Sequence, residues 1–268
     1  MNDGEDGLRI DLFGCGGAGA GLACIAAFLA GCASSPPSTP AIADTPWATA
    51  SRVSAVPPAP HAGWEHVALP GKTRVQFVAV GEGGGAALEA PAVSAASVVR
   101  KRVRIEAQDL GRLRFSWKVP QLIEAADLAT READDAPVRV ILAFDGDRSR
   151  LSGKDAMLSE LMRTLTGEEM PYATLMYVWC NKRAPGSVVR SPRTDRVRKL
   201  VLESGPDRLH RWIDYERDVR ADFEKVFGEP PGALIGVALM TDSDNTRSTA
   251  TALYGPVRHV APTASVAR

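Results

Sequence analysis

The sequence has no excess charge of either sign. Lys and Arg together number 32, as do Asp and Glu, so the formal net charge is zero. Nonspecific binding to DNA or RNA depends on a strong positive field, so this balance argues against nucleic acid as a partner. Hydrophobic residues make up 45% of the chain, which is ordinary for a globular protein. A chain of 268 residues is long enough for one large domain with tails.

Cysteine is almost absent from the body of the chain. Three of the four cysteines lie within the first 32 residues, and Cys180 is the only one beyond them. No intrachain disulfide can therefore hold the folded domain together. Cys180 follows Trp179 in an apolar run, which is typical of a small buried core residue. A nucleophilic cysteine would need a histidine partner, and His66, His210 and His259 show no recognisable spacing for that role.

The sequence also lacks an apolar run of the roughly 20 residues that a membrane-spanning helix needs. Its apolar N-terminal segment, residues 22–30, is too short and ends in small residues. Residues 29–32, Leu-Ala-Gly-Cys, are similar to a bacterial lipobox, whose cysteine is lipidated and becomes the first mature residue. The sequence therefore predicts a lipoprotein signal peptide over residues 1–31 and lipidation of Cys32. By the same resemblance, Ala33 favours the outer membrane of a Gram-negative bacterium, with the domain facing the periplasm and anchored only by acyl chains.

The first eleven residues depart from the signal-peptide pattern. They carry four acidic side chains against Arg9, whereas a signal peptide begins with positive charge. Two explanations remain open, translation that starts nearer Leu8 or a plain apolar N-terminal tail. The lipoprotein interpretation is kept because the apolar core and the lipobox stand in the expected order.

Residues 32–63 are rich in Ala, Ser, Pro and Thr. This composition buries too little apolar surface to form a core, so an extended tether is predicted, within which Trp47 has no evident role. The folded domain is expected to span residues 64–260, followed by a polar tail over 261–268.

Hydrophobic periodicity in the domain favours β-structure. Residues 112–119 alternate between polar and apolar side chains, which predicts a strand with one core face and one basic, exposed face. Helical periodicity is found at 154–170 and 219–227. The pattern predicts a mainly β fold, an antiparallel β-sandwich of jelly-roll, galactose-binding-like type with two peripheral helices. Further strands are expected over 74–80, 86–90, 98–105, 138–144, 172–180, 197–203, 209–213, 234–240 and 251–260.

The apolar strand 234–240 is followed at once by a polar loop. Hard oxygen ligands at this density suit calcium, so Asp242 and Asp244 are candidate metal ligands. An EF-hand is excluded, because Arg247 replaces the required glycine and Leu253 replaces the required glutamate. The alternative is a strand-end turn in which these side chains bond to the backbone. The loop's candidate ligand-binding residues are Asp242, Asp244, Asn245 and Thr246.

A second acidic pair, Asp134 and Asp135, precedes the predicted strand 138–144. If this pair converges with the carboxylates of the polar loop, the cluster is a candidate for ligand binding, a metal site or glycoside hydrolysis. The alternative for the pair is a solvated turn. Trp212 is a candidate platform for a sugar ring, although indoles near apolar strands belong more often to the core.

Five segments carry a resemblance to a known family. With them the chain resembles the bacterial family of domain of unknown function 3047 over residues 64–260. The resemblance implies a location and an order of elements, but no activity, because none is assigned to the family. The segments are LRFSWKV (113–119), ADDAPVRVILAF (133–144), LMYVW (175–179), ERDVRADFEKVFGEPP (216–231) and GVALMTDSDNT (236–246).

Architecture and location together favour one functional hypothesis over two others. The first is an envelope lipoprotein that binds a glycan or another envelope ligand without catalysis. The second is a metal- or carboxylate-dependent hydrolase of envelope glycans that uses the four aspartates. The third is a structural lipoprotein that binds an envelope protein. Calcium is the only cofactor that the residues suggest.

Overall fold

The computed structural model describes residues 41–53 and 63–262. The predicted signal peptide, Cys32, residues 54–62 of the predicted tether and most of the tail lie outside the described residues. None of the described helices is long and apolar enough to cross a membrane.

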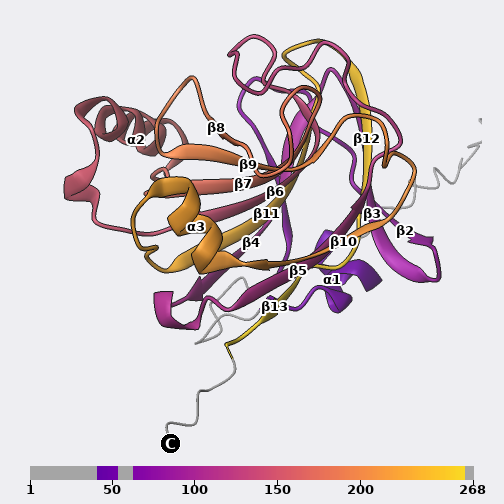
Figure 1. The fold of residues 1–268 in the computed structure, drawn as a ribbon, viewed down its shortest axis with the longest axis horizontal. Coiled ribbons are helices and arrows are strands. Elements are labelled where there is room, and N and C mark those ends of the chain that lie inside the picture. Colours follow the sequence, from indigo (N-terminus) through magenta and orange to yellow (C-terminus); the bar gives the residue numbers. More distant parts are fainter. Residues whose placement is uncertain (1–40, 54–62, 263–268) are drawn as a thin grey trace, which may run out of the picture. The chain divides into compact units, whose positions relative to one another are not determined.

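A seven-stranded sheet forms one layer of the domain (Figure 1). Its neighbouring strands are antiparallel except for one parallel pair, β7 with β9. In spatial order the strands are β1 (Glu65–Ala68), β4 (Ala96–Ile105), β11 (Leu234–Asp242), β6 (Ala136–Phe144), β7 (Ala173–Cys180), β9 (Val197–Ser204) and β8 (Val188–Arg190).

A second, fully antiparallel sheet forms the other layer. One strand of this sheet, β5 (Arg112–Lys118), pairs with β12 (Thr249–Tyr254) at its C-terminal end and with short β13 (Arg258–Val260) at its N-terminal end. Apart from β13, the strands in spatial order are β10 (Ile213–Asp218), β5, β12, β3 (Gly85–Val93) and β2 (Val78–Glu82).

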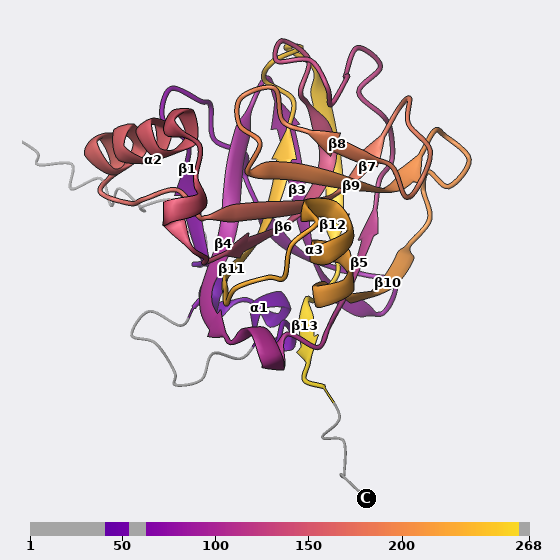
Figure 2. The same cartoon turned by 60° about the vertical axis from the view of Figure 1, so that its left-hand side comes forward.

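The two sheets pack against each other around one hydrophobic core (Figure 2). On β5 the alternate residues Leu113, Phe115 and Trp117 are buried, and the ring of Phe115 stacks on Tyr177 of β7 with centroids 5.5 Å apart. This contact joins a strand of one sheet to a strand of the other. The predicted mainly β, antiparallel jelly-roll sandwich is therefore confirmed.

Both predicted helices are present. Helix α3 (Val219–Phe227) begins where the Asp218 carboxylate accepts a hydrogen bond from the Ala221 N–H, and it ends at left-handed Gly228. Helix α2 (Gly153–Thr166) ends before residue 170, because left-handed Gly167 closes it. Its apolar side chains do not form a core face as the periodicity predicts, since Met157, Leu161 and Leu165 are all exposed.

The N-terminal boundary of the folded domain differs from the prediction. Residues 41–53, assigned from composition to the tether, contain the short helix α1 (Pro46–Ala50), and its Trp47 is completely buried. The indole Nε1–H of Trp47 donates a hydrogen bond to the Gly255 carbonyl at 3.0 Å, and its ring meets that of Trp64. The tether prediction is therefore wrong for this segment, because Trp47 and Val53 bury their side chains and anchor it to the domain.

Strand limits also differ from the prediction, and the single strand predicted over 251–260 is two strands, β12 and β13. The predicted strand 74–80 begins only at Val78, and the strand predicted over 209–213 is β10, which runs from Ile213 to Asp218. In β10 exposed residues alternate with buried or half-buried ones, as in a strand with one face towards the core. Three short 3-10 turns complete the described elements, Ile42–Asp44, Ala107–Asp109 and Arg148–Arg150.

Candidate functional site

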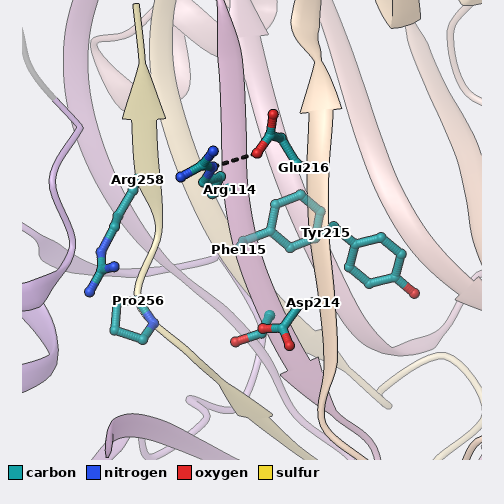
Figure 3. A pocket seen from close by; sticks show the side chains of 8 residues that line it. Arg114, Phe115, Asp214, Tyr215, Glu216, Pro256 and Arg258 are labelled. Atoms are coloured by element: carbon teal, nitrogen blue, oxygen red, sulfur yellow. Dashed lines mark hydrogen bonds and ion pairs between the residues drawn. The ribbon is translucent and has the colours of Figure 1, made fainter.

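A hollow of about 510 Å³ lies on the outer face of the six-stranded sheet (Figure 3). Strand alternation explains its polar lining. Phe115 of β5 faces the core, so Arg114 and Ser116 on either side of it face outward. On β10 the exposed Asp214 and Glu216 lie beside them.

Cross-strand pairing aligns three charged side chains in one row. Arg114 of β5 pairs with Glu216 of β10 on one side and with Arg258 of β13 on the other. Figure 3 shows the Arg114–Glu216 ion pair with Arg258 on the neighbouring strand. One row across three strands therefore presents two guanidinium groups and one carboxylate at the surface.

The arginines fix the charge of Glu216. Its two carboxylate oxygens accept hydrogen bonds from Arg112 Nη1 and Arg114 Nε, each at 2.5 Å. These bonds lower the pKa of Glu216, so its carboxyl group is ionised at neutral pH. The Arg258 Nε–H donates to the Ala50 carbonyl at 3.2 Å. Within the described part of the chain, the terminal nitrogens of Arg114 and Arg258 have no hydrogen-bond acceptor.

Two further hollows adjoin the first and share its lining residues. One, of about 680 Å³, shares Arg114 and Glu216 and extends towards α3. The other, of about 640 Å³, shares Arg258 and extends over α1. We call this continuous surface the arginine groove, defined by the basic side chains Arg52, Arg112, Arg114, Arg220 and Arg258.

The two acidic pairs predicted from sequence do converge, in what we call the acidic corner, defined by Asp134, Asp135, Asp242 and Asp244. Strand pairing explains this, because Asp242 at the end of β11 lies opposite Ala136 at the start of β6. Arg139 Nη2 joins the pairs, at 3.1 Å from Asp242 Oδ2 and 3.2 Å from Asp134 Oδ1.

Further partners bind Asp134, Asp135 and Asp244. Asp134 Oδ2 accepts a hydrogen bond from the Lys199 ammonium at 2.6 Å, and Asp244 pairs with Lys72. Asp135 Oδ2 accepts hydrogen bonds from the backbone N–H and the hydroxyl of Thr246, at 2.7 and 2.6 Å. Its Oδ1 accepts one from the Asn245 N–H at 3.2 Å. The turn that was the alternative prediction for the polar loop therefore exists, and it is held by a carboxylate 110 residues away.

Burial shifts the pKa values in the acidic corner. It raises the pKa of Asp242 to about 8, against the attraction of Arg139, and the neighbouring Asp244 contributes in the same direction. Burial also opposes ionisation of Asp244, yet the ammonium group of Lys72 holds the pKa of Asp244 below its usual range.

Three of the four carboxylates of the acidic corner are buried rather than open to solvent. Asp134, Asp135 and Asp242 are buried, with at most 7% of their surface exposed, because the paired bases and the polar loop cover them. A polymer such as a glycan cannot reach them in this arrangement. Trp212 lies apart from the corner, half-buried beside Gly83 in the β2–β3 turn, and lines none of the three hollows.

The residues of the arginine groove were not identified as site candidates from sequence. The alternation over 112–119 does predict a basic, exposed face, which contains Arg112 and Arg114. No sequence signal places Arg258 beside them, because that depends on the pairing of β13 with β5.

The family model of a protein of unknown function, DUF3047, matches residues 62–258. The chain belongs to the DUF3047 family. This confirms the resemblance found in the five sequence segments. No curated protein matches the chain.

Several solved structures are similar to the DUF3047 domain at low identity. One is the family 11 carbohydrate-binding module of the cellulosomal cellulase Lic26A-Cel5E of Clostridium thermocellum, with 8% identity, a TM-score of 0.36, and coverage of 76% of this chain and 91% of that one. Another is the xyloglucanase domain of NopAA from Sinorhizobium fredii in complex with cellobiose, with 8% identity, a TM-score of 0.37, and coverage of 76% and 100%. A third is the family 11 xylanase from Neocallimastix patriciarum, with 10% identity, a TM-score of 0.32, and coverage of 74% and 100%. Sequence identities and TM-scores this low do not support an inference about function.

Proposed function

We propose that the DUF3047 domain binds a carboxylate-bearing glycan of the bacterial envelope in the arginine groove, without catalysis. The observation that supports this is the row formed by Arg258, Arg114 and Glu216 across three strands. Guanidinium groups offer paired N–H donors in a planar fork that matches a carboxylate. Ionised carboxylates beside them accept hydrogen bonds from hydroxyl groups. A ligand with both acidic groups and hydroxyls uses both kinds of side chain.

The shape of the groove suits an extended ligand. The three hollows adjoin through shared side chains, from the region next to α3, over the exposed face of β5, to α1, so a chain of sugar units can lie along them. Small-molecule sites, in contrast, are concave and enclose most of their ligand. A polymer bound at an open surface gains affinity from several weak contacts in sequence.

The electrostatics of Glu216 support binding rather than hydrolysis. A glycosidase needs one carboxylic acid whose raised pKa keeps a proton available for the leaving group. The two arginines lower the pKa of Glu216, which makes it a poor proton donor at neutral pH. Glu216 is therefore a group that accepts hydrogen bonds in this proposal.

Isothermal titration calorimetry of the full chain tests the proposal. The probes are soluble muropeptides, which carry carboxylates, and chitohexaose, a neutral N-acetylglucosamine oligomer. We expect saturable binding of the muropeptides and much weaker binding of chitohexaose. Because a charge-assisted hydrogen bond contributes about 1.5–3 kcal/mol, R258Q and R114Q should each weaken muropeptide binding roughly tenfold or more.

The matched control is R163Q. Arg163 is an exposed arginine on α2 that pairs with Glu160, so it resembles Arg114 in charge and environment but lies outside the groove. This variant should bind like the unmodified protein. Absence of binding to both probes, or equal binding by R114Q, R258Q and the unmodified protein, would contradict the proposal.

We also propose that the protein is an outer-membrane lipoprotein anchored through Cys32. The support is the sequence alone, an apolar segment followed by Leu-Ala-Gly-Cys. Metabolic labelling with a palmitate analogue in a Gram-negative host, followed by fractionation, tests it. The palmitate analogue should be incorporated into the unmodified protein and should not be incorporated into C32S. Equal labelling of both, or of neither, would oppose the proposal.

A further inference from the structure

The acidic corner has the dimensions of a cation site. One carboxylate oxygen from each of Asp135, Asp242 and Asp244 lies within 4.8 Å of the other two. Two oxygens bound to one Ca²⁺ at about 2.3–2.6 Å lie at most about 5 Å apart. The three oxygens are therefore close enough to bind one ion together with only small side-chain movement.

A second observation concerns the free oxygen of Asp242. Asp242 is 94% buried, since 6% of its surface is exposed, and its Oδ2 faces Arg139. The other oxygen, Oδ1, is buried and has no hydrogen-bond partner among the described residues. A buried carboxylate oxygen without a partner costs free energy, so natural proteins seldom leave one unless an ion or water satisfies it.

The balance of acidic and basic side chains in the corner is compatible with a bound divalent ion. Three bases, Arg139, Lys199 and Lys72, form ion pairs with its carboxylates, and the charge of Arg193 also acts on Asp244. Arg139 and Lys199 are buried, whereas the Lys72 side chain is 34% exposed and reaches Asp244 from a surface turn. Together with Arg139 and Lys199, a divalent cation in place of the Lys72 ammonium would balance the charge of the four carboxylates.

We infer that the acidic corner binds Ca²⁺ through Asp135, Asp242 and Asp244, and that the ion displaces the ammonium group of Lys72. Asp135 retains a free lone pair for the ion, because a carboxylate has about four acceptor positions and three are occupied. The site is separate from the arginine groove, so the inference does not depend on the proposed function.

Calcium titration of the full chain after treatment with a chelator tests the inference. Calorimetry with CaCl₂, and with NaCl at matched ionic strength, should show saturable binding of Ca²⁺ only. D244N removes one charged ligand and should weaken binding roughly tenfold or more, because affinity depends on the number of charged ligands. K72M removes the competing ammonium and should strengthen binding by about the same factor.

The matched control is D195N, because Asp195 is an exposed aspartate outside the corner. It should bind Ca²⁺ like the unmodified protein. If neither the unmodified protein nor K72M binds Ca²⁺ saturably at millimolar concentration, the inference is wrong and Lys72 is simply a permanent part of an ion-pair network. Equal affinity of D195N and D244N would also overturn it. Circular dichroism spectra of all variants verify that each is folded.

Discussion

The ammonium group of Lys199 is buried, and burial makes a charge unfavourable. Lys199 projects from β9, only 1% of its surface is exposed, and its ammonium donates hydrogen bonds to Asp134 and to the Leu128 carbonyl. Burial lowers the pKa of Lys199 to about 8, repulsion from Arg139 adds to this, and the attraction of Asp134 offsets only part of it. The ion pair between Lys199 and Asp134 links β9 to the acidic corner. Even so, Lys199 binds its proton less tightly in the folded state than in the unfolded chain.

A pH dependence of stability follows from Lys199. Between pH 8 and the unfolded value near 10.5, the unfolded state binds more protons than the folded state. The contribution of Lys199 to the free energy of unfolding should therefore rise with pH across this window, by at most about 1.4 kcal/mol per pH unit. Below pH 8 the contribution should be constant.

Urea denaturation of the unmodified protein and K199M, each from pH 7 to pH 10.5 with a chelator present, measures this contribution as a difference. The difference in unfolding free energy should increase in favour of the unmodified protein above pH 8. A constant difference over the whole range would show that Lys199 has an ordinary pKa.

At the scale of secondary-structure elements, a short helix with one large side chain extends the domain towards the N-terminus. Helix α1 contributes completely buried Trp47, and Val53 just after it is also buried. The indole hydrogen bond to the Gly255 carbonyl attaches the segment to the connection between β12 and β13. Since β13 supplies Arg258, α1 supports one wall of the arginine groove.

Replacement of Trp47 tests whether residues 41–53 belong to the folded unit. W47A should lower the free energy of unfolding by about 3–5 kcal/mol, because it leaves a large cavity and an unpaired Gly255 carbonyl. W212A is the matched control, with a smaller expected loss, because Trp212 is only half-buried. Denaturation by urea measures both. Equal losses in the two variants would place Trp47 outside the core.

The connection into β11 depends on a close approach of two backbones. A Cβ atom at Gly232 would lie 2.2 Å from the Asp145 carbonyl oxygen, next to the hydrogen bond from the Asp145 N–H to the Ala233 carbonyl. G232A should therefore destabilise the protein by about 1–3 kcal/mol, as overpacking of a rigid site does. G153A is the matched control, because a Cβ there meets nothing within 4 Å. A thermal denaturation midpoint for G232A as high as that of G153A would contradict the prediction.

For the domain as a whole, one core joins both sheets. Four of the five tryptophans are buried, and they come from α1, β5, β7 and the residue before β1. All four belong to the same cluster of buried hydrophobic residues. A domain with one shared core loses its packing and its secondary structure together.

Unfolding should therefore be a single cooperative transition. Tryptophan fluorescence reports the core, and far-ultraviolet circular dichroism reports the sheets. The two signals should give the same urea midpoint and the same slope. A fluorescence change at clearly lower urea than the loss of dichroism would show that part of the core opens independently.

Features that depend on the local order of residues could be predicted from the sequence alone. The alternation over 112–119 predicted a strand with a core face and a basic face, and the helical periodicity at 219–227 predicted α3. The jelly-roll sandwich followed from many such strands with few helices. Neighbouring residues along the chain are sufficient for these predictions, because strand and helix periodicity are properties of short segments.

Which side chains come into contact depends on how distant strands pair in the folded domain. Arg258 lies beside Arg114 because β13 pairs with β5, and Asp242 approaches Asp134 because the end of β11 pairs with the start of β6. Lys199, from β9, then neutralises a carboxylate 65 residues earlier in the chain. Burial and charge at these sites depend on strand neighbours and register, which residue spacing does not encode.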